Sequence, residues 1–268
     1  MTITKAQAQR VLEVVDAGLV KGLGEPVPGK MCVEAAVCFA LGLKHGDEPT
    51  CVGSAVQRFK IRLNDAAWSS NKARTKGLRK LAVAQLGSDT INQQQFAKTL
   101  AKLTINRFLP VLFRDLAEKP RIKKWRVSFL EAADRCEREG TRESAQAARK
   151  AAAAAAAYAD AADAYAAADA AAYADAAYAA AYAYADAADA YAAAYAAAYA
   201  YADAADDAAA AAAAYAAAYA AYAADDAYDA AAAAAKKDKY LFMMADIGLE
   251  ALKQCNSPGC QYLDLVNA

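Results

Sequence analysis

The chain has 268 residues, 31 basic and 31 acidic side chains, six Cys and one His. No run of about 18 uncharged, strongly apolar residues occurs, so neither a transmembrane span nor a membrane partner is expected. The first residues lack the apolar core of a signal peptide, and we expect a cytoplasmic protein with reduced cysteines. Sites that need several histidines are excluded, because His45 is the only one.

The neutral total conceals three regions of different composition. Residues 1–150 carry 27 of the 31 basic and 15 of the 31 acidic side chains, a net charge of +12. Residues 151–235 consist of 59 Ala, 14 Tyr and 12 Asp, a net charge of −12. These shifts predict a basic domain over 1–140, a low-complexity helical tract over 141–235 and a C-terminal helix and tail over 236–268.

Apolar residues at helical spacing predict that the basic domain is compact and all-α. We expect Ser69 or Ser70 to cap a helix, Pro110 to interrupt one and Gly140 to end one. In the third predicted helix the apolar positions are assigned to Val56, Phe59, Ile61 and Leu63. The predicted helices span residues 5–20, 31–43, 52–63, 72–86, 96–116 and 122–139.

The low-complexity tract is predicted to be helical nearly throughout. It contains no Gly or Pro, and Ala has the highest helix propensity of all residues. On a helical wheel most Tyr lie on one side and most Asp on the other. The tract is either a tolerated repeat expansion or a surface that binds a partner through its Ala/Tyr face, and the sequence leaves both open.

The last predicted helix, residues 240–255, has an apolar face that needs a partner. The nearest candidate is the core of the basic domain, which requires the chain to return to its starting point. We therefore predict a hairpin or bundle of Ala-rich helices, with turns at residues 206–207 or 225–226, in place of one rod of about 128 Å. The C-terminal amphipathic helix then packs back on the basic domain.

Polar side chains cluster between residues 31 and 51. Zinc ligation by Cys32, Cys38, His45 and Cys51 is one hypothesis, but no Cys-x-x-Cys spacing occurs, and the first two cysteines point about 120° apart on a helix. In a second hypothesis, Cys32 is a reactive thiolate at a helix N-terminus and His45 is its general base. A third pairs Cys32 with Cys51 as a redox couple. The full cluster is Cys32, Glu34, Cys38, His45, Asp47 and Cys51.

The interpretation we favour is that these cysteines are small buried side chains. On this interpretation the protein has no catalytic residue, no metal and no cofactor. Glu34, in the middle of an apolar helix, is then a buried partner for an Arg or a cap for a loop.

Several motifs resemble a family of uncharacterised helical proteins from bacteria and phages. The motifs are Cys32-Val-Glu-Ala, Gly42, Asp47-x-Pro-x-Cys-Val, Leu63-Asn-Asp and Gly77-Leu-Arg-x-Leu. The resemblance covers residues 10–110 and the final helix, and implies an all-helical fold with a variable Ala-rich stretch but no defined activity. It further implies that aromatic residues often replace Cys38 and His45. Cys32, Glu34, Asp47 and Cys51 then remain as the family-like set.

Two basic groups are candidates for binding phosphates. The second flanks Trp125, whose ring is suited to stacking on a base, yet no helix-turn-helix or zinc-finger motif accompanies either group. A solvated helix face and a dock for the protein's own acidic tract are the competing interpretations. The first group is Lys72, Arg74, Lys76, Arg79 and Lys80, and the second is Lys119, Arg121, Lys123, Lys124 and Arg126.

These observations favour a non-enzymatic structural or interaction protein, with another protein or a second copy as its partner. The alternatives are nucleic-acid binding through the basic domain and a metal or thiol site centred on Cys32.

Overall fold

The computed structural model describes residues 2–118, 120–156 and 226–267 of the chain. Within these residues the secondary structure is helical, and the only extended pairings are isolated bridges of Met31 with Leu19 and Gly24. The all-α prediction is confirmed. The α-helices are α1 (Lys5–Asp16), α2 (Val33–Ala40), α3 (Ser54–Asp65), α4 (Asn71–Ala84), α5 (Gln93–Leu103), α6 (Leu109–Ala117), α7 (Arg126–Glu139), α8 (Arg142–Ala156) and α11 (Asp226–Gln254).

Side-chain caps fix the starts of the N-terminal helices. Thr4 and Gln7 form a reciprocal capping box at α1, and Ser70 accepts from the amide of Ala73 at α4, which confirms one of the two predicted caps. Helix α1 ends at Asp16 and α2 at Ala40, a few residues before the predicted ends at 20 and 43, because loops around Gly18 and Gly42, both with positive φ, follow them.

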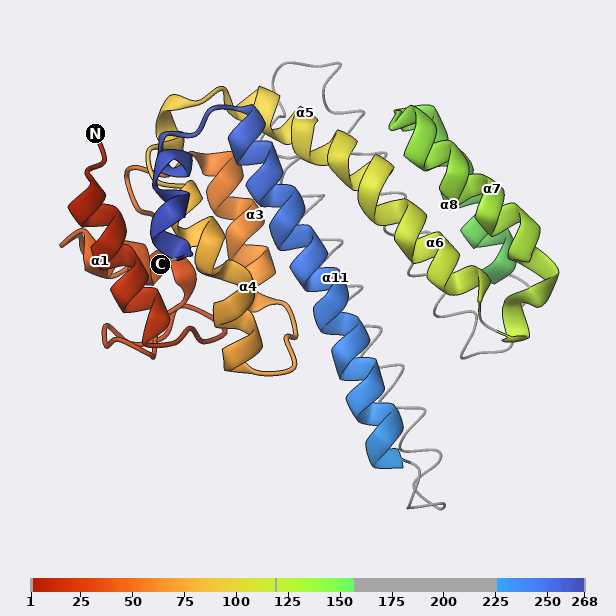
Figure 1. Cartoon of the computed structure of the whole chain (residues 1–268), viewed down its shortest axis with the longest axis horizontal. Helices are drawn as coiled ribbons and strands as arrows, with labels where there is room; N and C mark the ends of the chain where they lie inside the picture. Colours follow the sequence, from red (N-terminus) through yellow and green to blue (C-terminus); the bar gives the residue numbers. More distant parts are fainter. Residues whose placement is uncertain (1, 119, 157–225, 268) are drawn as a thin grey trace.

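Helices α5 and α6 form one nearly continuous rod despite Pro110 (Figure 1). A π turn, η2 (Thr104–Phe108), joins them, and Pro110 lies in the first turn of α6. The wider π turn provides room for the proline ring, which would clash with the carbonyl four residues earlier in a regular α-helix. The predicted interruption is therefore a change of helix type, and the rod continues through it.

Helix α7 packs along α6, and α8 packs on α7 (Figure 1). A 3-10 turn, η3 (Pro120–Trp125), precedes α7, which ends at Gly140 in the left-handed conformation, as predicted. On α8 the buried alanines recur every three or four positions, beside the buried Ser144, so the first turns of the Ala-rich region have one packed face. These residues are Ala145, Ala148, Ala152 and Ala155.

The C-terminal helix α11 returns to the basic domain and packs on α3, α4, α5 and η2 (Figure 1). Phe242 meets Trp68 edge-to-face at 5.3 Å, and Tyr240 meets Phe108 at 5.7 Å, measured between ring centroids. At Gly248 the backbone passes so close to Phe59 that a Cβ would lie 2.2 Å from its ring. This packing confirms that the final amphipathic helix covers its apolar face on residues 1–140.

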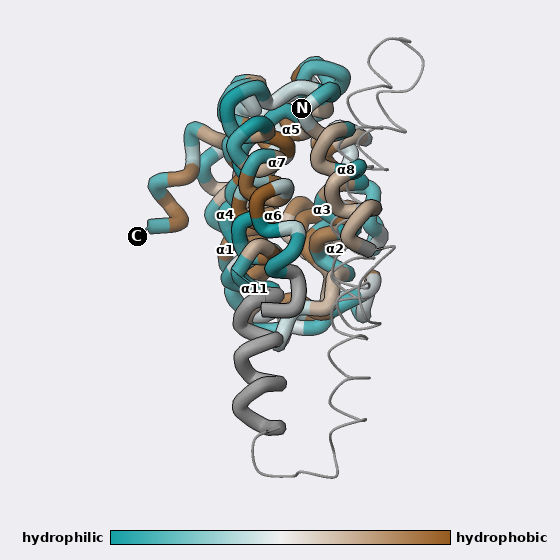
Figure 2. Tube along the Cα trace, turned by 90° about the vertical axis from the view of Figure 1, so that its right-hand side faces the viewer, coloured by the Kyte–Doolittle hydropathy of each residue, from teal (hydrophilic) through white to brown (hydrophobic). Residues whose placement is uncertain are grey.

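The tail after α11, for which no regular structure was predicted, completes the body. It forms a 3-10 helix, η4 (Pro258–Val266), against α4 and α1. The Tyr262 hydroxyl donates to the carbonyl of Ile3 at 2.7 Å, so the two ends of the described chain are bonded to each other. In Figure 2 the apolar segments lie mainly inside the helical body and the polar ones mainly on its outer turns.

The Ala/Tyr/Asp tract is described only at its two ends. Its first residues continue α8, and its last ten belong to α11, so the predicted boundary at residue 235 falls inside a helix. The proposed turn at 206–207, most of the Tyr and Asp faces and the choice between hairpin and rod lie outside the described residues.

Candidate functional site

The three cysteines of the predicted cluster occupy buried structural positions. Cys32 is the N-cap of α2, where its sulfur accepts a hydrogen bond from the amide of Ala35 at 3.3 Å. Cys38 lies in the same helix, and Cys51 lies in the loop before α3. The structure brings all three near Glu34, whose charge acts on each thiol.

Burial makes these thiols poor nucleophiles. Desolvation raises the pKa of Cys32 to about 11, and the hydrogen bond from Ala35, which favours the thiolate, only partly offsets it. Burial likewise raises the pKa of Cys38 to about 12. The helix N-terminus therefore fails to produce the reactive Cys32 thiolate that its position suggested.

The other members of the cluster hold loops in place. His45 Nε2 lies 3.1 Å from the carbonyl of Gly24, to which it donates in the matching tautomer. Asp47 accepts a hydrogen bond from the Gln57 amide at 2.6 Å, through its backbone oxygen. Among the residues with described side chains, no group of three or more His, Cys, Asp or Glu is arranged to hold a metal ion. The geometry thus gives no support to zinc at Cys32, Cys38, His45 and Cys51.

Glu34 has a partner that the sequence analysis did not identify. Its Oε1 lies 3.5 Å from Nζ of Lys60 on α3, and both side chains have 0% exposure. The expected buried partner exists, but it is a Lys. The difference matters, because a buried ammonium can release its proton, whereas a guanidinium stays charged.

Gln85 is the third member of this buried group. It follows the last turn of α4, has 0% exposure and faces Glu34, whose pKa its amide helps to lower. Neither atom of the Gln85 amide, neither carboxyl oxygen of Glu34 nor Nζ of Lys60 makes a hydrogen bond of normal geometry. We call Glu34, Lys60 and Gln85 the sealed cluster.

Burial dominates the electrostatics of the sealed cluster. Desolvation raises the pKa of Glu34, and the positive charge of Lys60 counteracts it. Desolvation lowers the pKa of Lys60, and Glu34 counteracts that shift. Both shifts favour the neutral forms, a carboxylic acid beside an amine.

The position of Lys60 could have been read from the sequence. Val56, Phe59, Lys60 and Leu63 follow the i, i+3, i+4, i+7 spacing of one helix face, and all four are buried. Ile61, which was assigned to the apolar face, is only half-buried. The prediction did not include Lys60 on this face, and lysine is rarely buried unless paired.

A second polar network holds the glycine-rich loop over residues 18–31. Asn64 accepts from the amide of Val33 at 3.2 Å and donates to the carbonyl of Val20 at 3.0 Å. Asp65 accepts from the amide of Gly22 at 2.8 Å. The Leu-Asn-Asp motif therefore has a structural role at the end of α3.

The first basic group divides into internal and exposed residues. Arg74 is buried and donates to the carbonyl of Asn64 at 2.7 Å, and Arg79 pairs with Asp16 at 2.6 Å. These two are parts of the fold. The residues of this group that remain exposed follow α4 at four-residue spacing, and they are Lys72, Lys76 and Lys80.

The second basic group lies on η3 and the start of α7. Lys123 and Lys124 are exposed, and Lys124 Nζ lies 5.4 Å from the centroid of the half-buried Trp125 ring. Arg126 pairs with Glu118 at 3.3 Å. Lys119 and the side chain of Arg121 lie outside the part that the structure describes.

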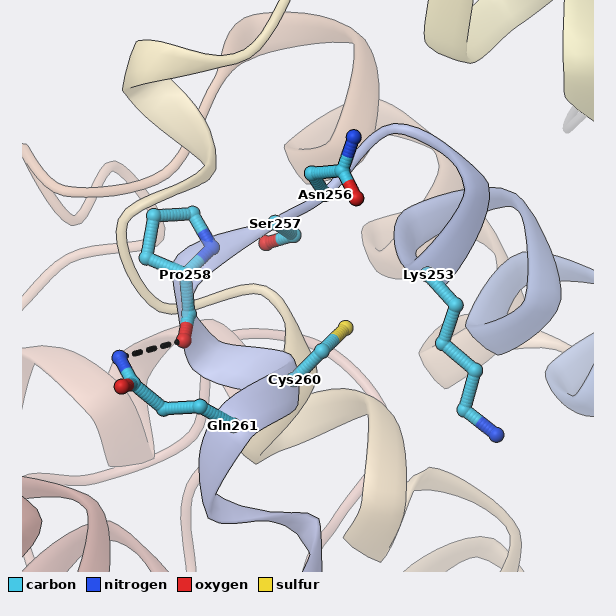
Figure 3. A pocket seen from close by; sticks show the side chains of 6 residues that line it. All are labelled: Lys253, Asn256, Ser257, Pro258, Cys260 and Gln261. Carbon is cyan, nitrogen blue, oxygen red and sulfur yellow. Dashed lines mark hydrogen bonds between the residues drawn. The ribbon is translucent and has the colours of Figure 1, made fainter.

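An open hollow of about 380 Å³ lies where α11 turns into η4 (Figure 3). Its polar groups mostly serve the turn: Ser257 donates to the carbonyl of Ala84 at 2.6 Å, and Gln261 donates to that of Pro258 at 3.0 Å. Burial raises the pKa of Cys260 to about 11. The hollow gathers no set of groups suited to catalysis. Its lining is Lys253, Asn256, Ser257, Pro258, Cys260 and Gln261.

Comparison with known proteins gives no match to a family model, a curated protein or a solved structure. Among the described helices, none combines the length and apolar composition that crossing a bilayer requires.

Proposed function

We propose that the protein is a non-enzymatic structural or interaction protein whose helical body holds both ends of the acidic Ala/Tyr/Asp tract. The observation that carries this proposal is that both helices into which the tract runs, α8 and α11, pack on the body. The resemblance of residues 10–110 to bacterial and phage proteins adds a bacterial or phage source to the proposal.

The two attachments are built differently. On α8, the buried side chains are those of Ser144 and of alanines, so this attachment uses only small side chains. On α11, Leu241, Met244 and Leu252 are buried, and hydrogen bonds reinforce them. Asp238 accepts from both the amide and the hydroxyl of Ser69. The body therefore fixes the exit and the return of the tract independently.

The composition of the tract indicates the chemistry of its partner. Twelve Asp and 14 Tyr among 85 residues favour a basic protein surface with apolar patches that accept aromatic rings. A second copy offers such a surface, because residues 1–150 carry +12. The tract of one copy is therefore proposed to bind the body of another.

Sedimentation velocity of the full chain tests this proposal. We expect concentration-dependent self-association that weakens between low and high salt, because exposed charges are screened. Replacing Tyr191, Tyr195 and Tyr199 by Ala should abolish the association without lowering the melting temperature of the body. An unchanged association in this variant, or a strictly monomeric parent, contradicts the proposal and favours a passive spacer. Deleting residues 184–201 provides a second variant, whose body should melt as the parent does.

A second candidate function, nucleic-acid binding, is supported by the exposed stripe of Lys72, Lys76 and Lys80 on α4. Residues at four-residue spacing lie on one side of a helix, where three ammonium groups can follow a phosphate backbone. A gel shift with duplex and single-stranded DNA at two salt concentrations tests it. Binding should fall steeply with salt and be lost in the triple Lys→Gln variant. The matched control removes three exposed lysines from separate segments: Lys21, Lys44 and Lys102.

A further inference from the structure

An exposed apolar side chain follows the densest run of basic residues in the chain. Val127, in the first turn of α7, is 68% exposed, more than any other large aliphatic side chain that the structure describes. The eight residues before it, 119–126, include five basic residues and no acidic one. A single exposed valine needs no explanation by itself, but here it lies within concentrated positive charge, which attracts an acidic partner.

The exposed groups lie about one helical turn apart. Helix η3 runs directly into α7, so Lys123 and Lys124 precede Val127 by four and three residues, a separation at which side chains are neighbours on a helix surface. Both lysines are exposed, and Nζ of Lys124 lies 5.4 Å from the centroid of the half-buried Trp125 ring. We call Lys123, Lys124 and Val127 the η3–α7 surface.

The acidic tract carries the complementary pattern. Four-residue spacing links, in order, Tyr191, Tyr195, Tyr199, Asp203 and Asp207. On a helix, which the composition of the tract predicts, each of these phenol rings or carboxylates lies one turn from the next. The η3–α7 surface likewise has its ammonium groups one turn from its apolar group, so carboxylates and rings of the tract can be accommodated together.

The η3–α7 surface adjoins the place where the tract leaves the body. Only residues 140 and 141 separate α7 from α8, and the two helices pack on each other, so the end of α8 lies beside the start of α7. Helix α8 also contacts η3. In two copies related by a twofold axis, a tract that reaches the partner's surface therefore has its own surface reached in return.

We propose that the η3–α7 surface of one copy binds residues 191–207 of a second copy, and that two such contacts close a dimer. The carboxylates of this segment pair with Lys123 and Lys124, and its tyrosine rings pack on Val127. This inference rests on the proposed function and adds to it the surface that receives the tract. Because exposed ion pairs contribute little singly, the dimer should be weak and sensitive to salt.

Sedimentation velocity of the nuclease-treated full chain tests the proposal. The parent should reach the mass of a dimer and form no larger species. The surface variant, Lys123→Gln/Lys124→Gln/Val127→Ser, should raise the dissociation constant at least about tenfold. The tyrosine variant, in which Tyr191, Tyr195 and Tyr199 are replaced by Ala, should do the same. Thermal melts verify that both variants fold.

A matched control makes the same three chemical changes elsewhere. Lys21→Gln/Lys44→Gln/Val27→Ser alters two exposed lysines and an exposed valine in and beside the glycine-rich loop, at the other end of the body from α7 (Figure 1). It removes as much positive charge and as much exposed apolar area of the same kind. This control should dimerise as the parent does, and an equal loss in it would overturn the assignment of the surface.

A mixing experiment asks whether the surface and the tract bind each other. The surface variant keeps an intact tract, and the tyrosine variant keeps an intact surface. Neither should dimerise alone, but an equimolar mixture should form a heterodimer through the one contact that remains, with lower affinity than the parent dimer. A mixture that stays monomeric overturns the proposal.

The remaining outcomes separate this inference from the proposed function. Unchanged dimerisation of the surface variant, together with loss in the tyrosine variant, overturns the assignment of the η3–α7 surface and leaves the proposed function standing. A strictly monomeric parent overturns both. Species larger than a dimer overturn the closed arrangement, and self-association that nuclease treatment abolishes assigns the lysines to nucleic acid and overturns the contact between copies.

Discussion

Two carboxyl–amine pairs in this protein show how burial changes the consequence of the same contact. Lys239 and Asp115 approach to 2.9 Å where α11 meets α6, with side chains 49% and 26% exposed. Glu34 and Lys60 are slightly farther apart, at 3.5 Å, and have no exposure. Water stabilises the separated charges of the first pair, so its net contribution is small. The second pair has no such alternative, and losing one partner leaves the other unsolvated.

Lys60→Met should have the largest effect on stability. It leaves the buried Glu34 carboxyl without its amine and should cost about 3–5 kcal/mol in the free energy of unfolding. Denaturant titration measures this loss. Lys60→Met/Glu34→Met, which replaces both polar groups by apolar ones, should recover most of it. A double variant no more stable than the single one would contradict the interpretation that the unpaired carboxyl causes the loss.

The pH dependence of the single variant sharpens the contrast between the two pairs. Burial raises the pKa of Glu34 above its ordinary value of 4.5, so the folded state of Lys60→Met binds a proton that the unfolded state releases. Stability is therefore fully present below about pH 4.5 and should fall as pH rises toward the folded-state pKa, by about 1.4 kcal/mol per pH unit. Titrations at several pH values should show this slope in Lys60→Met. Lys60→Met/Glu34→Met should lack the slope.

Gly248→Ala should destabilise the apolar side of the α11 interface. The added Cβ would lie 2.2 Å from the Phe59 ring, and overpacking of this kind costs about 1–3 kcal/mol. The change raises helix propensity by about 1 kcal/mol, so a net loss would show that packing outweighs propensity here. In thermal melts, Phe59→Leu/Gly248→Ala should lose less stability than the sum of the two single changes. Strict additivity would contradict the predicted clash.

The smallest effects are expected at the exposed pair. Tyr240→Phe removes a hydroxyl that donates to Asp115 Oδ2 at 2.8 Å and should cost about 0.5–1.5 kcal/mol. Lys239→Ala, the matched control on the same carboxylate, should cost at most about 1 kcal/mol and less at high salt. Denaturant titrations at two salt concentrations measure both changes. A loss at Lys239 as large as that at Lys60 would invalidate the comparison between the pairs.

Helix positions could be predicted because they depend on local pattern. The spacing of Val11, Leu12 and Val15 and the stop at Gly140 are properties of short segments, and the structure has helices where they indicated. The return of the final helix was also predictable, because its apolar face has to be covered somewhere. The tail was predicted without structure, and its 3-10 helix was not foreseen, since residues 258–266 have no regular apolar repeat.

Of the three residues of the sealed cluster, only Glu34 was predicted from the sequence to be buried. Glu34 stood out as a charge among apolar residues, but nothing singled out Lys60 and Gln85, whose residue types usually lie on the surface. Gln85 lies at the end of an apolar run, Leu81 to Leu86, in which every residue is buried. What brings the three together is the packing of α2, α3 and α4, which no spacing along the chain specifies.

The late position of α11 in the chain has a consequence for synthesis. Trp68, Phe59 and Phe108 lie on segments that emerge early, yet the rings and glycine that cover them belong to residues 240–248. Between Ala117, where α6 ends, and Tyr240 the ribosome adds about 120 residues, which takes about 6–25 s at about 5–20 residues per second. Throughout that interval the side chains of Trp68, Phe59 and Phe108 are not yet packed against α11. The nascent chain therefore exposes these rings to solvent and to chaperones until residues 240–248 have left the ribosome, and the synthesis of α11 sets the earliest time at which the body closes.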